Sequence, residues 1–397
     1  MFEIKEQFVA QQILECLRQG TVPKQYAPQV MIGRTFWLDA LGEDMDFVAN
    51  GASKIRFLSA PYGGGKSHFL SAVEQIAIEK HFLVADVELH SREAPLDRFE
   101  IIFPKIMRSL ICSSGTNVLE IVFNKWLNSS QLYDRQAINQ EVRAISQSLD
   151  FQAALRAFVE MADSSYPEDE QTKQAVLGWL CGDAISPILR KHTHIRNKIA
   201  ITNVSEIFGS FLRLVRRSGF SGVAILLDEA EAVTSLTQSR KRDEANQNIR
   251  KLLDNADSHE GLLIVFATTP SFLEDEKRGA RSYPALWDRI KTVIKAPPCV
   301  QPNKRTLIIE LEPPTKNELG KAAKFVLQLH SLAYAWGAAS LFSDITLSKL
   351  VEKYLRTSPE RVYRRFLRTL VGMLDSLEQA QGILTANGLV EGVEFEQ

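Results

Sequence analysis

The sequence predicts an α/β fold in which helices cover both faces of a parallel sheet. Short apolar runs with the length of buried strands alternate along the chain with stretches of helical periodicity. One such run, residues 55–58, leads through a glycine-rich loop into a helical pattern. Another, residues 223–227, ends in two adjacent acids, Asp228 and Glu229. Strands that alternate with helices favour a parallel sheet, and ligands bind at the carboxyl ends of its strands.

Composition limits the class of protein. The chain has 397 residues, so two or three packed parts are expected. Its net charge of −1 gives no general basic field, so any contact with nucleic acid must be local. The four cysteines form no Cys-x-x-Cys pair, which argues against disulfides and zinc sites and favours a reducing cytoplasm. No apolar run reaches membrane-spanning length, so no membrane contact is expected.

The order of the expected elements defines three parts of the chain. These are an N-terminal helix with the segment after it (1–35), a core (36–312) and a C-terminal helical lid (313–397). Because 162 positions separate Lys66 from Asp228, a large helical insertion at about 113–217 is expected to project from the core and to offer a partner-binding surface. Five strands are expected, at residues 55–58, 82–87, 223–227, 262–267 and 306–311.

The glycine-rich loop has the pattern of a phosphate-binding P-loop, although Ala60 stands where the pattern has glycine. Glycines let backbone N–H groups turn onto phosphate oxygens, and the helix N-terminus adds partial positive charge. Lys66 is predicted to reach the β- and γ-phosphates, and the Ser67 hydroxyl to ligate Mg²⁺. An ordinary glycine-rich turn is the alternative. The predicted cofactor-binding loop comprises Pro61, Tyr62, Gly63, Gly64, Gly65, Lys66, Ser67 and His68.

The acids at the end of residues 223–227 have the pattern of a Walker B motif. Asp228 is predicted to hold Mg²⁺ through water, and Glu229 to orient and deprotonate the attacking water. Thr268 or Thr269, at the tip of the next strand, is predicted to position that water near the γ-phosphate. A structural strand exit is the alternative for the two threonines. Together with the P-loop, these residues predict a nucleotide triphosphatase that uses ATP and Mg²⁺.

Three arginines downstream are candidates for an arginine finger, which would stabilise charge on the phosphoryl group in a neighbouring subunit. They are Arg278, Arg281 and Arg289, of which Arg289 and Arg281 are preferred. Surface salt bridges are the alternative role.

A basic stripe is expected on a helix near residue 361. Arg361, Arg364, Arg365 and Arg368 recur at three- and four-residue spacing. Such a stripe can contact nucleic acid or a partner, although a solvated helix face is the more ordinary reading. A second basic cluster, residues 240–242, could line a pore or a DNA groove.

Two short segments resemble parts of AAA+ and STAND ATPases. Ile32-Gly33-Arg34, a turn ahead of the P-loop, resembles their nucleotide-base-binding segment. Arg361 is placed like the sensor-2 arginine of AAA+ lids, which contacts the γ-phosphate. The resemblance therefore adds Gly33, Arg34 and Arg361 to the expected ATP site of an AAA+-like P-loop NTPase.

Longer stretches resemble the BREX-type ATP-binding proteins, AAA+-related ATPases of bacterial phage-defence islands. They are residues 60–70, 178–183, 219–231 and 281–286. The resemblance spans most of residues 10–370 and implies an ATPase that forms homo-oligomers and works with DNA and other defence proteins. The chain departs from the family pattern at Ala60 and in having no obvious winged-helix module after the lid.

Three functions remain open at this point. The first is an ATP-hydrolysing motor or loader that acts on DNA or on a DNA-bound complex. The second is a STAND-like switch that holds nucleotide, recruits partners and turns over slowly. The third is a scaffold whose fold is merely locked by nucleotide.

Overall fold

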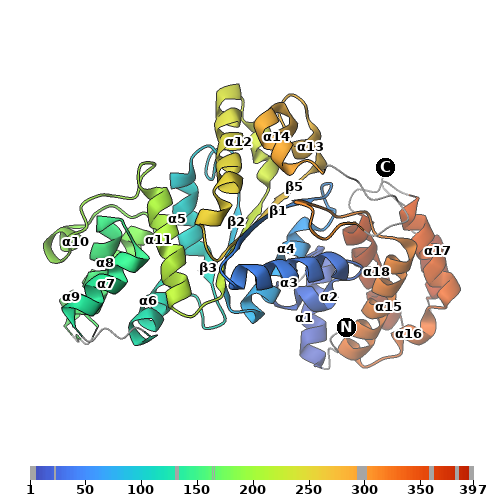
Figure 1. The fold of residues 1–397 in the computed structure, drawn as a ribbon. Helices are drawn as coiled ribbons and strands as arrows, with labels where there is room; N and C mark the ends of the chain where they lie inside the picture. Colours follow the sequence, from blue (N-terminus) through green and yellow to red (C-terminus); the bar gives the residue numbers. More distant parts are fainter. Residues whose placement is uncertain are drawn as a thin grey trace. The chain divides into compact units, whose positions relative to one another are not determined.

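The computed structural model describes residues 6–21, 24–129, 134–162, 164, 166–292, 302–356, 362–380 and 384–392. The chain divides into two compact units (Figure 1). The first unit combines Met1–Asp39, Leu58–Gln75 and Ile309–Gln397. The second combines Ala40–Phe57 and Ile76–Ile308. Each unit has its own hydrophobic core.

A six-stranded sheet has the order β3-β2-β4-β5-β1-β6. In the second unit, β2, β4 and β5 are parallel, and β3 is antiparallel to β2. The five expected strands are confirmed, and β3 is an addition, since two residues at the end of a helix carry no periodic signal. The strands are β1 (Ser53–Ser59), β2 (Phe82–Glu88), β3 (Leu110–Ile111), β4 (Gly222–Asp228), β5 (Leu262–Thr268) and β6 (Ile308–Glu310).

The central strands are nearly continuous apolar runs because a parallel sheet is covered on both faces. Arg56 in β1 is an exception, with only 1% of its surface exposed. Its guanidinium donates to both oxygens of Asp44 at 2.6 and 2.8 Å. Asp44 lies on α3 (Thr35–Ala49), so the buried charge of this strand is compensated by a helix of the same unit.

The helices of the second unit include a group that extends well beyond the sheet. In Figure 1, α6 to α10 lie together past α5 and α11, on the side of β3. The helical character expected for residues 113–217 is confirmed. The helices are α5 (Phe99–Ser109), α6 (Val118–Ser129), α7 (Arg135–Ile145), α8 (Leu149–Glu160), α9 (Pro167–Leu180), α10 (Pro187–His192), α11 (Val204–Arg217), α12 (Ser239–Asp254), α13 (Pro270–Glu274) and α14 (Pro284–Ile290).

The first unit is helical around the P-loop. α1 (Gln7–Gln19) packs against α15 (Lys316–Tyr334) and α18 (Val362–Gln379). Asp375 of α18 joins the three helices by accepting hydrogen bonds from Arg18 at 2.7 and 2.8 Å and from His330 at 3.0 Å. The remaining helices are α2 (Ala27–Val30), α4 (Lys66–Glu79), α16 (Ala338–Leu341), α17 (Asp344–Leu355) and α19 (Ala386–Glu391).

In the described parts of the chain, every helix is too short or too polar to cross a bilayer. The boundaries after residues 35 and 312 that separate the three predicted parts of the chain stay predictions.

Candidate functional site

The predicted P-loop lies between the end of β1 and the first residue of α4, Lys66. Gly63 and Gly65 have φ angles of 78° and 90°, a region that side chains with a Cβ rarely adopt. The loop therefore delivers the chain directly to the N-terminus of α4, where backbone N–H groups lack helical partners and attract anions. Lys66 is buried, Ser67 is exposed, and Tyr62 keeps 57% of its surface exposed.

Close packing of the loop explains why residue 64 is glycine and why alanine is accommodated at residue 60. The Gly64 N–H donates to the carbonyl oxygen of Pro61 at 2.9 Å. A Cβ on Gly64 would lie 2.9 Å from that oxygen and 3.0 Å from the Cβ of Ala60, so only glycine fits. Ala60 is buried and has a negative φ, so its methyl group is accommodated without backbone strain.

Arg34 connects the loop to the segment that leads into α15. Its Nη2 donates to the carbonyl oxygens of Gly64 at 3.2 Å and Glu312 at 3.1 Å. Its Nη1 is buried and has no hydrogen-bond partner among the described residues. Burial lowers the pKa of Arg34, while the nearby Glu318 carboxylate opposes that change. Gly33 has a φ of 81°, and a Cβ there would lie 2.0 Å from Glu318 Oε1.

His68, in the first turn of α4, is held as a neutral imidazole. Its Nε2 lies 3.2 Å from the carbonyl oxygen of Ala27, which makes Nε2 the protonated nitrogen. Burial, opposed by the hydrogen bond to Ala27 and aided by the positive charge of Arg34, lowers the pKa of His68 to about 4. His68 therefore carries no charge near neutral pH.

Arg34, Gly64 and His68 line a pocket, and only some of its lining residues are predicted from the sequence. Its polar atoms include the Tyr363 hydroxyl, which is buried and has no partner within the described chain. Burial raises the pKa of Tyr363 well above its usual range, so the hydroxyl remains protonated. Tyr363 and Glu318 are not predicted as site residues from the sequence, because neither belongs to a recognisable motif. The pocket is lined by Met31, Ile32, Arg34, Gly64, Gly65, His68, Pro314, Glu318 and Tyr363.

The two predicted acids lie in the second unit, where β4 ends. Asp228 is the last residue of β4, and its Oδ1 accepts a hydrogen bond from the Glu229 N–H at 2.9 Å. Glu229 has a φ of 57°, a left-handed conformation that is uncommon outside glycine and concentrates at functional sites. This left-handed conformation makes the backbone turn sharply directly after β4.

Thr268 ends β5 beside these acids. The register pairs Leu227 with Phe266, so β4 and β5 reach their carboxyl ends together. The Thr268 side chain is fully buried, and its hydroxyl has no partner among the described residues. The Thr269 hydroxyl instead lies 2.8 Å from that of Ser271. Of the two predicted threonines, Thr268 thus has the hydroxyl that is left for a ligand or water.

Glu88 belongs to the same edge of the sheet. It is the last residue of β2 and is paired in register with Asp228. A pocket beside it is lined by Glu88, His90, Glu93 and Lys105, among others. In the sequence, Glu88 could have been recognised as a candidate because it is the acid that directly follows the apolar run at residues 82–87.

A family model for the BREX system ATP-binding protein BrxC/D matches residues 5–391. The chain belongs to this family. The Walker-type ATPase PABY2304 of Pyrococcus abyssi is a solved structure with 14% sequence identity and a TM-score of 0.28, and the match covers 88% of this chain and 76% of that one. A comparison with curated proteins finds no match.

In this member of the BrxC/D family, two of the candidate finger arginines are engaged within their own unit. Arg289 makes a two-pronged pair with Asp254, with Nη2 3.0 Å from Oδ2, and this hydrogen bonding raises its pKa. Arg281 lies 3.4 Å from Glu276 and stacks over Trp287 at 5.9 Å. All three candidates, including Arg278, are exposed. Arg361 lies outside the described residues.

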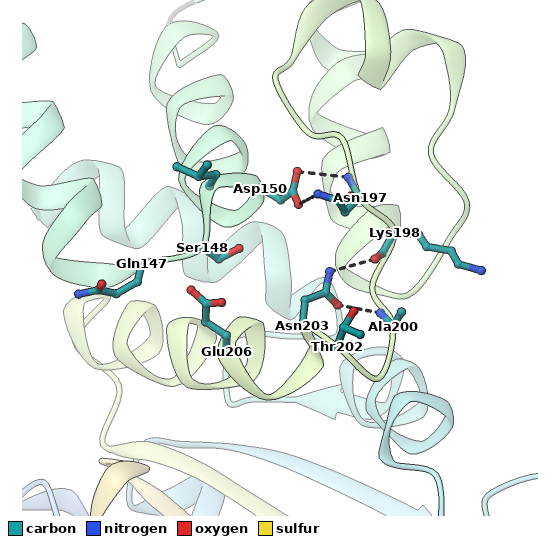
Figure 2. A pocket seen from close by; sticks show the side chains of 10 residues that line it. Gln147, Ser148, Asp150, Asn197, Lys198, Ala200, Thr202, Asn203 and Glu206 are labelled. Carbon is teal, nitrogen blue, oxygen red and sulfur yellow. Dashed lines mark hydrogen bonds between the residues drawn. The ribbon is translucent and has the colours of Figure 1, made fainter.

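A further pocket of about 610 Å³ lies among the helices of residues 113–217. Figure 2 shows Asp150 at the start of α8 facing the loop that carries Asn197. The Asp150 carboxylate accepts hydrogen bonds from the N–H groups of Arg196 and Asn197 at 2.6 and 3.3 Å and from the Asn197 side chain at 2.9 Å. Its acceptors are therefore used to hold the loop in place.

Proposed function

We propose that this chain binds ATP with Mg²⁺ and hydrolyses it. The observation that carries the proposal is the pocket that joins P-loop glycines to two buried polar groups, Arg34 Nη1 and the Tyr363 hydroxyl, which have no partner among the described residues. Buried polar groups without partners are uncommon in folded proteins and call for an explanation. ATP whose phosphates lie on the loop and the N-terminus of α4 would bring its own polar groups next to these two donors.

Each residue of the proposed site has a separate task. Lys66 would neutralise the β- and γ-phosphates. The Ser67 hydroxyl and the Asp228 carboxylate are oxygen ligands of the kind Mg²⁺ prefers, and bound Mg²⁺ would neutralise charge on the phosphates. Glu229 would accept a proton from the attacking water, and the Thr268 hydroxyl would help to hold that water.

A steady-state ATPase assay with the Lys66→Ala and Glu229→Gln variants tests the proposal. Loss of a general base typically costs about 10²–10⁴-fold in rate, so Glu229→Gln should bind ATP but turn over that much more slowly. Lys66→Ala should lose both binding and turnover. Unchanged turnover in both variants would refute the assignment.

We further propose that the ATPase works as a homo-oligomer on DNA or on a DNA-bound complex, together with other defence-system proteins. Membership of the BREX family and the exposed arginines support this proposal. Arg289 or Arg281 would then reach the γ-phosphate of a neighbouring subunit, and Arg361 that of its own.

A STAND-like switch is the second candidate. Arg34 supports it, because one guanidinium bonds both the P-loop carbonyl of Gly64 and the carbonyl of Glu312 ahead of α15. Nucleotide that pairs with Nη1 would stabilise this link. Tight retention of ADP or ATP with negligible turnover would favour the switch over the motor.

A further inference from the structure

The exposed side of α18 carries three arginines in its first turns. Arg364, Arg365 and Arg368 are exposed and form no ion pair or hydrogen bond within the described residues. The helix has no acidic residue from Val362 to Leu374. Three other cations of the same unit have acidic partners: Arg18 pairs with Asp375, Lys316 with Glu352 and Lys324 with Asp344. We call these three side chains the arginine face.

The arginine face is held on a rigid support. The opposite side of α18 is buried in the core of the first unit through Phe366, Leu370 and Leu374. The aliphatic stem of Arg364 lies against Gly20, where a Cβ would stand only 3.0 Å from its Cγ. The glycine at the end of α1 thus lets this stem pack closely, while the guanidinium remains exposed.

The spacing of the face suits a polyanion. Arg364 and Arg368 are one turn apart, about 6 Å along the helix, and Arg365 lies beside them. Gly372 and Ser376 continue the same row at four-residue steps, and a Cβ on Gly372 would meet nothing within 4 Å. Two guanidinium groups followed by two small residues leave room for a continuous backbone to approach the helix.

We propose that the arginine face binds the sugar–phosphate backbone of nucleic acid without reading its bases. Arginine bonds phosphate with two parallel N–H donors, and duplex DNA offers one charge per about 1.7 Å of its axis. An acidic protein partner fits less well, because α18 presents no large apolar side chain to solvent and protein interfaces are usually centred on such groups. The proposal rests on the proposed action on DNA and names the surface for it.

Fluorescence anisotropy with a labelled 30-base-pair duplex tests this surface, at 50 to 200 mM salt with saturating ADP. The full chain is compared with a variant carrying Arg364→Gln, Arg365→Gln and Arg368→Gln. Each lost phosphate contact lowers the salt slope by about 0.9, so the slope should fall by about 2–3 and the affinity by at least about tenfold. A duplex of unrelated sequence should give the same result.

The matched control carries Arg240→Gln and Lys241→Gln on α12, the competing basic cluster, and should bind DNA as the unaltered chain does. If instead this control loses DNA and the α18 variant retains it, the arginine face is the wrong surface. Polyglutamate that displaces the duplex at equal charge concentration would point to an acidic protein and overturn the proposal. Binding of a fluorescent ATP analogue is measured in parallel. An unaltered chain that binds nucleotide but no duplex would defeat the DNA proposal and leave the ATPase proposal intact.

Discussion

Ala60 departs from the P-loop pattern at a residue where the structure tolerates the change. Its side chain is buried beneath the loop, and its Cβ occupies space that Gly64 leaves empty by having no Cβ of its own. The positions that need glycine for their φ angles, Gly63 and Gly65, have it. The loop therefore keeps its conformation despite the substitution, and the sequence alone could not decide this because the contact depends on how the loop closes.

Tyr363→Phe should separate stability from nucleotide binding. The Tyr363 hydroxyl is buried without a partner in the described chain, and such a group costs about 1–3 kcal/mol. The variant should therefore match or exceed the unaltered protein in free energy of unfolding without nucleotide, by up to about 1 kcal/mol. Its affinity for a fluorescent ATP analogue should fall several-fold, because the hydroxyl no longer donates to the ligand.

Tyr354→Phe is the control for that experiment. The Tyr354 hydroxyl donates to Thr369, so its removal should destabilise the protein by about 1 kcal/mol and leave nucleotide affinity unchanged. A Tyr363→Phe variant that loses stability but keeps its affinity would contradict the assignment of the hydroxyl to the nucleotide pocket.

His68 should make stability depend on pH between about 4 and 6.5. In the folded protein burial holds the pKa of His68 to about 4, whereas the unfolded chain titrates near 6.5. Below pH 6.5 the unfolded state binds the extra proton, so the free energy of unfolding should fall as pH drops, by up to about 3 kcal/mol in total. Denaturant unfolding at pH 7, 6 and 5 measures this slope.

His68→Gln retains an N–H donor for Ala27 but does not titrate, so it should flatten the curve over that range. His194→Gln removes an exposed histidine and should leave the slope as it was. Equal slopes for the His68 variant and the unaltered protein would show that His68 is not the titrating group.

At the scale of elements, α1 depends on a contact with the opposite end of the sequence. Burial would raise the pKa of Asp375, but hydrogen bonds from Arg18 and His330 lower it well below its usual range. The apolar periodicity predicted α1 and the helices after residue 313 separately. Their packing could not be predicted, because it joins segments more than 300 residues apart, through buried apolar side chains such as Leu14 and through the polar pair of Arg18 with Asp375.

Asp375→Asn should loosen α1 from α15 and α18. Removing the charge leaves the half-buried Arg18 guanidinium with only the exposed Glu15 as a counterion, so we expect a loss of about 2 kcal/mol in the free energy of unfolding. Hydrogen exchange should increase selectively along Gln7–Gln19. Asp344→Asn, whose partner Lys324 is exposed, should cost no more than about 0.5 kcal/mol and leave exchange in α1 unchanged. Equal effects of the two substitutions would argue against a special role for Asp375.

On the scale of the whole molecule, the P-loop belongs to the first unit and the acids Asp228 and Glu229 to the second. The family match extends across both units. The arginine-finger proposal, in contrast, needs a second copy of the chain, and this gives it a direct test.

Mixing inactive subunits should restore activity if a finger acts between subunits. Arg289→Ala and Glu229→Gln are each expected to be inactive alone, but a mixed oligomer contains sites with an intact Glu229 facing an intact Arg289. Turnover of up to about a quarter of the unaltered level is expected at equal ratio in steady-state assays, by random pairing of adjacent subunits. Arg281→Ala is tested in the same way. If no ratio restores turnover for either arginine, neither acts between subunits.

The P-loop, the acids at the end of β4 and most of the strands could be predicted from the order of the amino acids. These features are local: glycines at positions with positive φ, apolar runs of strand length, and polar residues where a strand ends. Only the tertiary structure placed Tyr363 and Glu318 in the pocket with Arg34, paired Arg289 with Asp254 and added β3 to the sheet. Those outcomes depend on which distant segments are buried against each other, and burial decides which polar groups are left without partners.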